Sequence, residues 1–434
     1  MTTAEFGSFT LVLLLILAAA HLCGYIFQRL RQPRVVGEIV AGILIGPSVL
    51  GHFAPHLSAS LFGAAGSGFH VVLFFLYNLG LLLLMFHSGA ETRNLFGRGD
   101  RKETSWLAGV GTGLPFLLGL LAAPWLPLDW LMGPARQHSS LVLVIGIAIA
   151  VTSIPVISRI FYDLKILHTR FARLVLGVAV LEDIVLWAVL GIATALAKSG
   201  VIPRGEMVNH VAATMVFFVA GLALMPRLLR RINTARWNVF SRASPAGYLV
   251  VVLFLYSAVA SAFDVSLVFA AFLAGFAVGA DRLLPAEALA SLGRVSFAVF
   301  IPIYFAIVGY RLDLGKDFSL SMLALFVVGG CVLKLISAGM GARLARFRGL
   351  DAINLAVALN ARGGPGIVLA SVAYDAGIIN GTFFTTLVLM AIITSQAAGA
   401  WLEYVLRKGW PLLSGHPEEA ALAAEPIVPR ELAA

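Results

Sequence analysis

The chain has 434 residues, of which 60% are hydrophobic and only 12% charged, and its formal net charge is +9. Soluble domains contain roughly 25% charged residues, so this composition excludes an ordinary soluble enzyme or binding domain. Apolar runs of about 20 residues recur along the chain, each long enough to cross a hydrocarbon core of roughly 30 Å. We therefore predict an all-α, polytopic membrane protein, because a transmembrane β-barrel would show much shorter alternating segments.

The hydropathy pattern predicts about 13 transmembrane helices, followed by a short tail. The helices are expected at 9–28, 35–51, 70–91, 105–124, 139–161, 171–196, 210–231, 247–263, 266–281, 293–312, 319–343, 353–376 and 381–406, and the tail at 407–434.

The charge distribution predicts the orientation of these helices. Most of the 31 Lys and Arg residues fall in alternate loops, which the positive-inside rule places in the cytoplasm. The N-terminus is then outside and the tail cytoplasmic. Because the basic residues serve as a topology signal, no nucleic-acid partner is expected, and the lipid bilayer is the surrounding partner.

Two pairs of motifs indicate an internal repeat. Ala41-Gly42 with Gly46 matches Ala274-Gly275 with Gly279, and "VTSIPVIS" in helix 139–161 is matched by "NARGGPGIVLAS" in helix 353–376. Both matches are seven helices apart, and an odd offset inverts the second copy. The pattern predicts two inverted six-helix repeats joined by a linker helix at 210–231, which is a plan of secondary transporters.

Four ionisable residues lie near the middle of predicted helices. They are Glu182 and Asp183 in "GVAVLEDIVLWAVL", Lys334 and Arg362. Such groups cost roughly 2.5–3.5 kcal/mol each to insert, so each needs a physical reason. Adjacent helical residues point about 100° apart, so one acid can pair with Lys334 while the other faces a wet cleft.

We assign Asp183 as the acid without an ion-pair partner. A carboxyl group in a low-dielectric site favours its neutral form, and it can exchange the bound proton for a cation. Asp183 is therefore the expected ligand of a monovalent cation. For Glu182 and Lys334 the residues alone leave two roles open, direct participation in transport and structural support.

Two helices contain residues that break an α-helix at mid-membrane. Pro155 interrupts one, and Gly363, Gly364 and Pro365 interrupt the other. Backbone groups freed by a break must line a cavity or contact protein, because lipid offers no partner. We expect the broken helices to cross beside Asp183.

Further polar residues at the breaks complete the predicted site. Thr152, Ser153 and Asn360 would supply oxygen ligands for a cation. Arg362 either neutralises the helix ends at the crossing or pairs with an acid.

Several motifs taken together resemble a known family. "VVGEIVAGILIGPSVLG", "VAVLEDIVLWAVL", "FIPIYFAIVGYRLDL", "VLKLISAG" and "NARGGPGIVLA", in this order, are similar to the monovalent cation–proton antiporters, specifically the Kef/Nap-type bacterial branch. The resemblance covers about residues 9–406. It implies exchange of Na⁺ or K⁺ for protons by alternating access, with Asp183 at the position of the ion- and proton-binding aspartate.

The resemblance also implies a domain organisation within a transmembrane antiporter domain at 1–406. A homodimer is expected, with a dimerisation part at 9–91 and 247–312, a moving core at 105–196 and 319–406, and the linker between them. Glu182 occupies a position that is aspartate in well-known sodium antiporters and that pairs with the lysine at the position of Lys334.

Two other functions remain alternatives. One is a potassium efflux pathway of channel type, and the other is a sodium-coupled symporter for an organic solute. The sequence shows no metal-ligand cluster, Walker loop or nucleophile motif, so we expect neither an enzyme nor a cofactor.

Overall fold

The computed structural model describes residues 3–30, 32–62, 68–95, 101–198, 204–235, 238–279 and 286–414. Residues 415–434 of the expected tail lie outside the described part of the chain.

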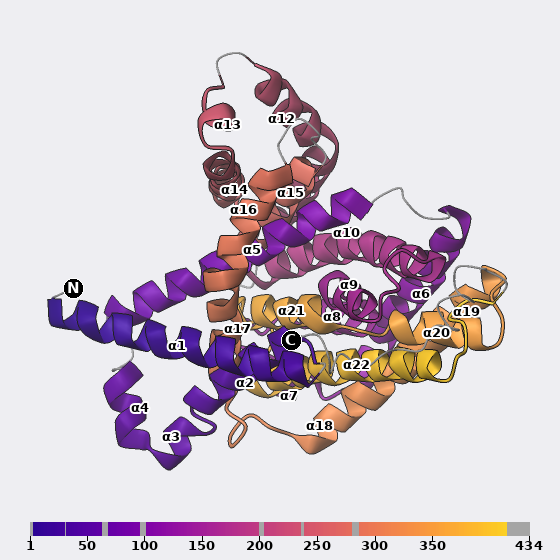
Figure 1. Ribbon diagram of the computed structural model, residues 1–434, viewed down its shortest axis with the longest axis horizontal. Coiled ribbons are helices and arrows are strands. Elements are labelled where there is room, and N and C mark those ends of the chain that lie inside the picture. Colours follow the sequence, from indigo (N-terminus) through magenta and orange to yellow (C-terminus); the bar gives the residue numbers. More distant parts are fainter. Residues whose placement is uncertain are drawn as a thin grey trace, which may run out of the picture.

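The described residues form helices throughout, joined by short turns (Figure 1). The helices of the first half are α1 (Thr3–Arg29), α2 (Arg34–Ile45), α3 (Leu50–Phe53), α4 (Pro55–Phe62), α5 (Gly68–Leu95), α6 (Arg101–Ala122), η1 (Ala123–Trp125), α7 (Leu128–Leu131), α8 (His138–Ala150), α9 (Ile154–Asp163) and α10 (Arg170–Lys198). Those of the second half are α11 (Arg204–Val219), η3 (Ala220–Leu224), α12 (Met225–Thr234), α13 (Phe240–Ala243), α14 (Pro245–Ala262), α15 (Leu267–Gly279), α16 (Ala286–Val295), η4 (Ser296–Phe300), α17 (Ile301–Tyr310), α18 (Leu320–Ala324), η5 (Leu325–Gly329), α19 (Gly330–Leu344), α20 (Leu350–Ala358), α21 (Gly363–Asp375) and α22 (Gly381–Arg407).

Among these residues, 12 helical segments are long and apolar enough to span a membrane. A thirteenth apolar helix, Leu267–Gly279, is shorter and corresponds to the helix expected at 266–281, of which residues 280 and 281 are outside the described part. The all-α polytopic fold predicted from hydropathy is therefore confirmed.

Both predicted helix breaks are present. The span 138–162 divides into α8 and α9 at residues 151–153, and the span 350–375 divides into α20 and α21 at residues 359–362. Pro155 lies in the first turn of α9, and Pro365 lies in the first turn of α21. Each proline thus lies in the first turn of the second half-helix. Backbone N–H groups in a first turn have no partner within the helix, so the N–H that proline lacks costs no hydrogen bond.

Other spans are less regular than the sequence predicts. The helix expected at 35–51 is interrupted after Ile45, where Gly46 adopts an extended conformation. Two π-helical turns, η3 and η4, directly precede helices that have Pro226 or Pro302 near their start. Proline removes a hydrogen-bond donor from the helical ladder, and a wider turn accommodates this loss.

Two pairs of tightly packed helices reflect the internal repeat. α2 packs against α17, and α15 packs against α5. A Cβ atom on Gly42 would meet the carbonyl oxygen of Ala306 at 1.9 Å, and one on Gly275 would meet that of Phe86 at 1.8 Å. The paired motif glycines therefore allow equivalent backbone approaches in the two halves.

Candidate ion-binding site

The two acids of "GVAVLEDIVLWAVL", Glu182 and Asp183, lie in the middle of α10 and are almost completely buried. Glu182 is 1% exposed and Asp183 is 0% exposed. α10 contacts α5 and α6 as well as both halves of the two broken helices. The carboxyl groups are thus enclosed by protein.

Glu182 has charged and polar partners. Lys334 on α19 donates a hydrogen bond from Nζ to Oε1 of Glu182 over 2.8 Å, and both side chains are inaccessible to solvent. The hydroxyl of Thr112 on α6 donates to the same oxygen. The ammonium group of Lys334 compensates the charge on Glu182. The two hydrogen bonds connect α10 with α19 and with α6.

Asp183 has no such compensation. Neither of its carboxyl oxygens has a hydrogen-bond partner among the described residues. Glu182 is its neighbour in the chain, and Glu91 on α5 lies within electrostatic reach of it. A buried polar group without a partner is rare in native proteins and calls for a ligand or a proton.

The two helix breaks touch each other directly. The N–H of Ser153 donates to the carbonyl oxygen of Ala361 over 2.7 Å, and the hydroxyl of Thr152 donates to that of Leu359 over 2.5 Å. Gly363 has a φ of +39°, and a Cβ atom there would lie 2.4 Å from Cγ2 of Val156. Glycine is required at this point because the conformation is left-handed and the two chains are in close contact.

Two cationic side chains bind the carbonyl groups at the end of α8. Arg362 donates from Nε to the oxygen of Ala148 over 2.9 Å and from a terminal nitrogen to that of Ile149 over 3.1 Å. Lys334 donates to the oxygen of Ala150. These carbonyls are the unpaired, negative end of the helix dipole, which positive charge stabilises.

The alternatives left open for Arg362 are distinguished by these contacts. Its partners are carbonyl groups, including that of Gly330 at 3.0 Å, and the side-chain oxygen of Asn360 at 2.7 Å. None of its hydrogen-bond partners in the described part of the chain is a carboxylate. These contacts therefore favour the first of the two roles expected for Arg362, at the helix ends of the crossing.

The candidate oxygen ligands differ in their availability. Asn360 accepts from Arg362, so its side-chain oxygen is already engaged. Ser153 caps α9 by accepting from the N–H of Val156 over 3.3 Å. Thr152 acts as a donor to a carbonyl, which leaves its oxygen lone pairs as acceptors. Thr152 and Ser153 thus retain more ligand capacity than Asn360.

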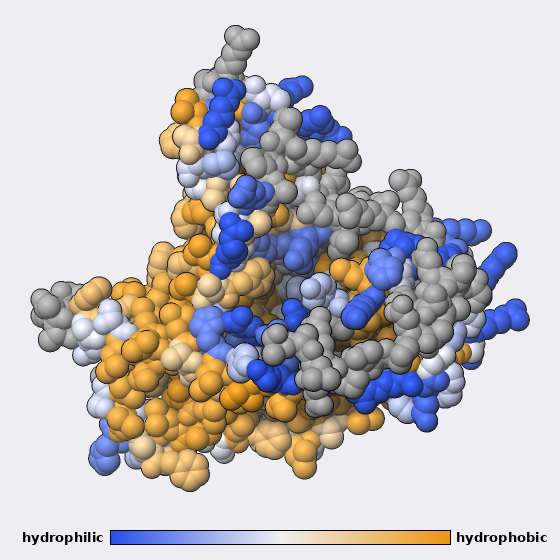
Figure 2. Space-filling model, viewed as in Figure 1, coloured by the Kyte–Doolittle hydropathy of each residue, from blue (hydrophilic) through white to orange (hydrophobic). Residues whose placement is uncertain are grey.

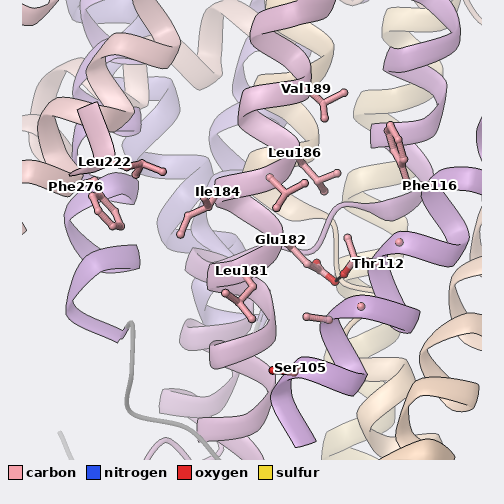
Figure 3. A pocket seen from close by; sticks show the side chains of 14 residues that line it. Ser105, Thr112, Phe116, Leu181, Glu182, Ile184, Leu186, Val189, Leu222 and Phe276 are labelled. Atoms are coloured by element: carbon pink, nitrogen blue, oxygen red, sulfur yellow. Dashed lines mark hydrogen bonds between the residues drawn. The ribbon is translucent and has the colours of Figure 1, made fainter. Parts of the chain in front are cut away.

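A cavity of about 650 Å³ opens between α6, α10, η3 and α15 and reaches Glu182 (Figure 3). Its walls are largely apolar, and Figure 3 shows Glu182 and Thr112 pointing toward each other beside Phe116 and Leu186. Asp183 is not part of the lining. The acid expected to face a cleft is therefore enclosed in this conformation, and the cavity meets its neighbour, which points in another direction around α10.

Two residues at the site were not identified from the sequence. Thr112 bonds Glu182 from α6, and Glu91 near the end of α5 acts electrostatically on Asp183. A threonine in an apolar run is too common to be singled out. Glu91 follows the apolar run "LGLLLLMFHSGA" directly. An acidic residue at the end of a predicted membrane span could have been identified as a candidate from the sequence.

Comparison with known proteins gives consistent results along most of the chain. The family described as "Sodium/hydrogen exchanger, transmembrane" matches residues 16–408. The Na⁺/H⁺ antiporter NhaS4 of Synechocystis sp. is 27% identical over 390 residues, which covers 88% of this chain and 93% of the relative. The K⁺/H⁺ antiporter 1 of Saccharomyces cerevisiae is 28% identical over 402 residues, covering 88% of this chain but 44% of the relative.

A solved structure shows the same fold. The sodium–proton antiporter MjNhaP1 from Methanocaldococcus jannaschii aligns with a TM-score of 0.62 at 16% identity, over 92% of this chain and 98% of that one.

Proposed function

Because the chain belongs to the sodium/hydrogen exchanger family, we propose that it exchanges a monovalent cation, Na⁺ or K⁺, for protons across the membrane. The observation that carries this proposal is Asp183, a fully buried carboxyl group whose two oxygens lack partners among the described residues, on a helix that contacts all four halves of the two broken helices. Na⁺ and K⁺ are hard cations that bind oxygen ligands, and a carboxylate can bind either such an ion or a proton. Competition for one carboxylate couples the two fluxes.

The neighbouring residues have supporting roles in this proposal. The oxygens of Thr152 and Ser153 would complete the coordination of the cation together with Asp183. The ion pair of Glu182 with Lys334 holds α10 and α19 together, and Arg362 holds the crossing by binding α8. Because the charges of these residues are compensated, Asp183 is the carboxyl group that would bind a proton and a cation in turn.

We further propose that transport proceeds by alternating access, in which one part of the chain moves against another. We assign 9–91 and 247–312 to a dimerisation part, 105–196 and 319–406 to a moving core, and 210–231 to the linker. Asp375 at the end of α21 accepts from Tyr77 on α5 over 2.9 Å and from Arg311 just after α17 over 2.7 Å. This cluster joins the core to the dimerisation part at one end, and transport would require it to open.

The assembly and its orientation follow from the same proposal. We assign the protein to the bacterial inner membrane as a homodimer with its N-terminus outside. α1 exposes a row of large apolar side chains, including Phe6, Leu14, Leu22 and Tyr25, which suits a lipid or partner contact.

Purified protein in proteoliposomes with an internal pH indicator tests the function. Addition of Na⁺, K⁺ or Li⁺ outside should move protons outward for at least one cation, and Asp183→Asn should abolish this while the protein stays folded. Cation flux without proton movement would instead support a channel-type pathway. Transport that requires an organic substrate would support a symporter.

A further inference from the structure

The last two turns of the linker span carry a compact group of arginines. Arg227, Arg230 and Arg231 on α12 are exposed, and together with Thr234 they line a hollow of about 330 Å³. Arg230, Arg231 and Thr234 follow Arg227 by three, four and seven residues, which places each of them on the same side of the helix as Arg227. Figure 2 shows hydrophilic side chains gathered over α12 and α13.

No carboxylate of the described residues pairs with this group of positive charges. Among the described residues, none of the three arginines has a carboxylate partner, and Arg227 donates only to the carbonyl of Ala223. Other basic residues are paired, as Arg170 is with Glu103 at 3.4 Å. Three guanidinium groups converging on one hollow therefore leave a site for an anion. Arginine suits phosphate in particular, because its planar fork matches the phosphate oxygens.

The position of the hollow indicates a membrane anion. The span Ala212–Thr234 ends at the hollow, so the arginines lie where a membrane-spanning helix leaves the hydrocarbon core. Leu224 and Leu228, on the adjoining face of the helix, are 58% and 42% exposed. A ligand bound here would meet guanidinium groups and apolar side chains together, as a phospholipid does with its headgroup and acyl chains.

The hollow belongs to a bend with a defined shape. Asn238, which follows α12, is 3% exposed, donates to the carbonyl of Ile232 over 3.3 Å and accepts from the N–H of Ser241 over 3.2 Å. Tyr248 on α14 donates to Asn233 over 2.6 Å. Beyond the bend, Phe240 is 70% exposed. The arginine face is thus held in place next to a second apolar surface.

From these observations we propose that the hollow on α12 binds the phosphate group of an anionic phospholipid. Arg227, Arg230 and Arg231 contact the headgroup, and Leu224 and Leu228 contact the acyl chains. The site depends on neither Asp183 nor ion exchange, and it does not depend on which side of the membrane this end of α12 faces.

Native mass spectrometry of the purified protein with added lipids tests the site. Phosphatidylglycerol should occupy the protein on the order of tenfold more than phosphatidylcholine, because three positive side chains attract its headgroup. The triple variant Arg227→Gln/Arg230→Gln/Arg231→Gln should lose this preference. The single variant Arg231→Gln should lose part of the preference for phosphatidylglycerol, and it tests the site if the triple variant does not fold.

The matched control is Arg343→Gln/Arg346→Gln/Arg348→Gln, which removes three exposed arginines at the end of α19. It should retain the preference, as should Asp183→Asn. A preference that survives in the variants at α12, or that the control loses equally, would overturn the proposal. Inorganic phosphate at the same concentration should not displace the lipid; displacement would identify a site for soluble anions and would equally overturn it.

Discussion

Two carboxyl groups adjacent in the chain have different surroundings in this protein. Glu182 accepts hydrogen bonds from Lys334 and Thr112, whereas both oxygens of Asp183 lack a partner among the described residues. The cause is the helical rotation of roughly 100° per residue, which directs neighbours to different elements. One acid can therefore stabilise the fold while the other is available for a ligand.

The ion pair of Glu182 and Lys334 is expected to be structural. Lys334→Met should lower the free energy of unfolding by about 3–5 kcal/mol, because it leaves a buried carboxylate uncompensated. The double variant Glu182→Gln/Lys334→Met should recover most of this loss. Thermal unfolding in detergent measures both, and a double variant no more stable than the single one would contradict the pairing.

Glu91 is expected to attract the cation without binding it as a principal ligand. The side chain is exposed and its charge acts on Asp183. Glu91→Gln should raise the apparent KM for the cation about two- to fivefold at low ionic strength, with the maximal rate unchanged and the effect reduced by salt. Glu287→Gln, which removes an exposed acid on α16, is the control and should leave KM unaltered.

At the scale of elements, the crossing of the two broken helices depends on close backbone contact. Gly363 and Gly364 are adjacent but differ sharply: a Cβ atom on Gly363 would lie 2.4 Å from Cγ2 of Val156 and 2.7 Å from Oγ of Ser153, whereas one on Gly364 would meet nothing within 4 Å. The requirement for glycine is therefore specific to one of the two positions.

Alanine substitution tests this difference. Gly363→Ala should destabilise the protein by about 1–3 kcal/mol and reduce transport, because the added methyl forces the two breaks apart and strains the backbone. Gly364→Ala should be close to the wild type in both. Unfolding temperature and proteoliposome flux report the two effects, and equal behaviour of the variants would contradict the geometry described here.

At the scale of the whole molecule, Asp375 with Tyr77 and Arg311 connects segments that transport would separate. Asp375→Asn removes the charge that both partners bind, so α21 should open more readily at this end. Hydrogen exchange at residues 371–380 should increase about tenfold, as expected for the loss of about 1.5 kcal/mol of charge-assisted bonding. The control variant Arg407→Gln breaks an ion pair with Glu403 within α22 and should not alter hydrogen exchange at residues 371–380. Unchanged exchange in both variants would show that the cluster around Asp375 does not hold α21 in place.

The sequence predicted the features that local chemistry determines. Apolar runs gave the spans, and Pro155 and the glycines before Pro365 gave the breaks. The partners of Arg362 could not be predicted, because they are backbone carbonyls such as that of Ala148, 214 residues away. The same holds for Tyr77 and Asp375, 298 residues apart, because hydropathy does not specify which side chains from distant helices meet.

The shared use of Asp183 by protons and the cation is tested most directly by the pH dependence of cation affinity. In proteoliposomes the apparent KM for the transported cation should rise as the pH falls, approaching roughly tenfold per pH unit, while the maximal rate at saturating cation stays nearly constant. Such behaviour is the signature of competition for one site. An apparent KM independent of pH, with proton flux still present, would show that the two ions bind separately and would contradict the account.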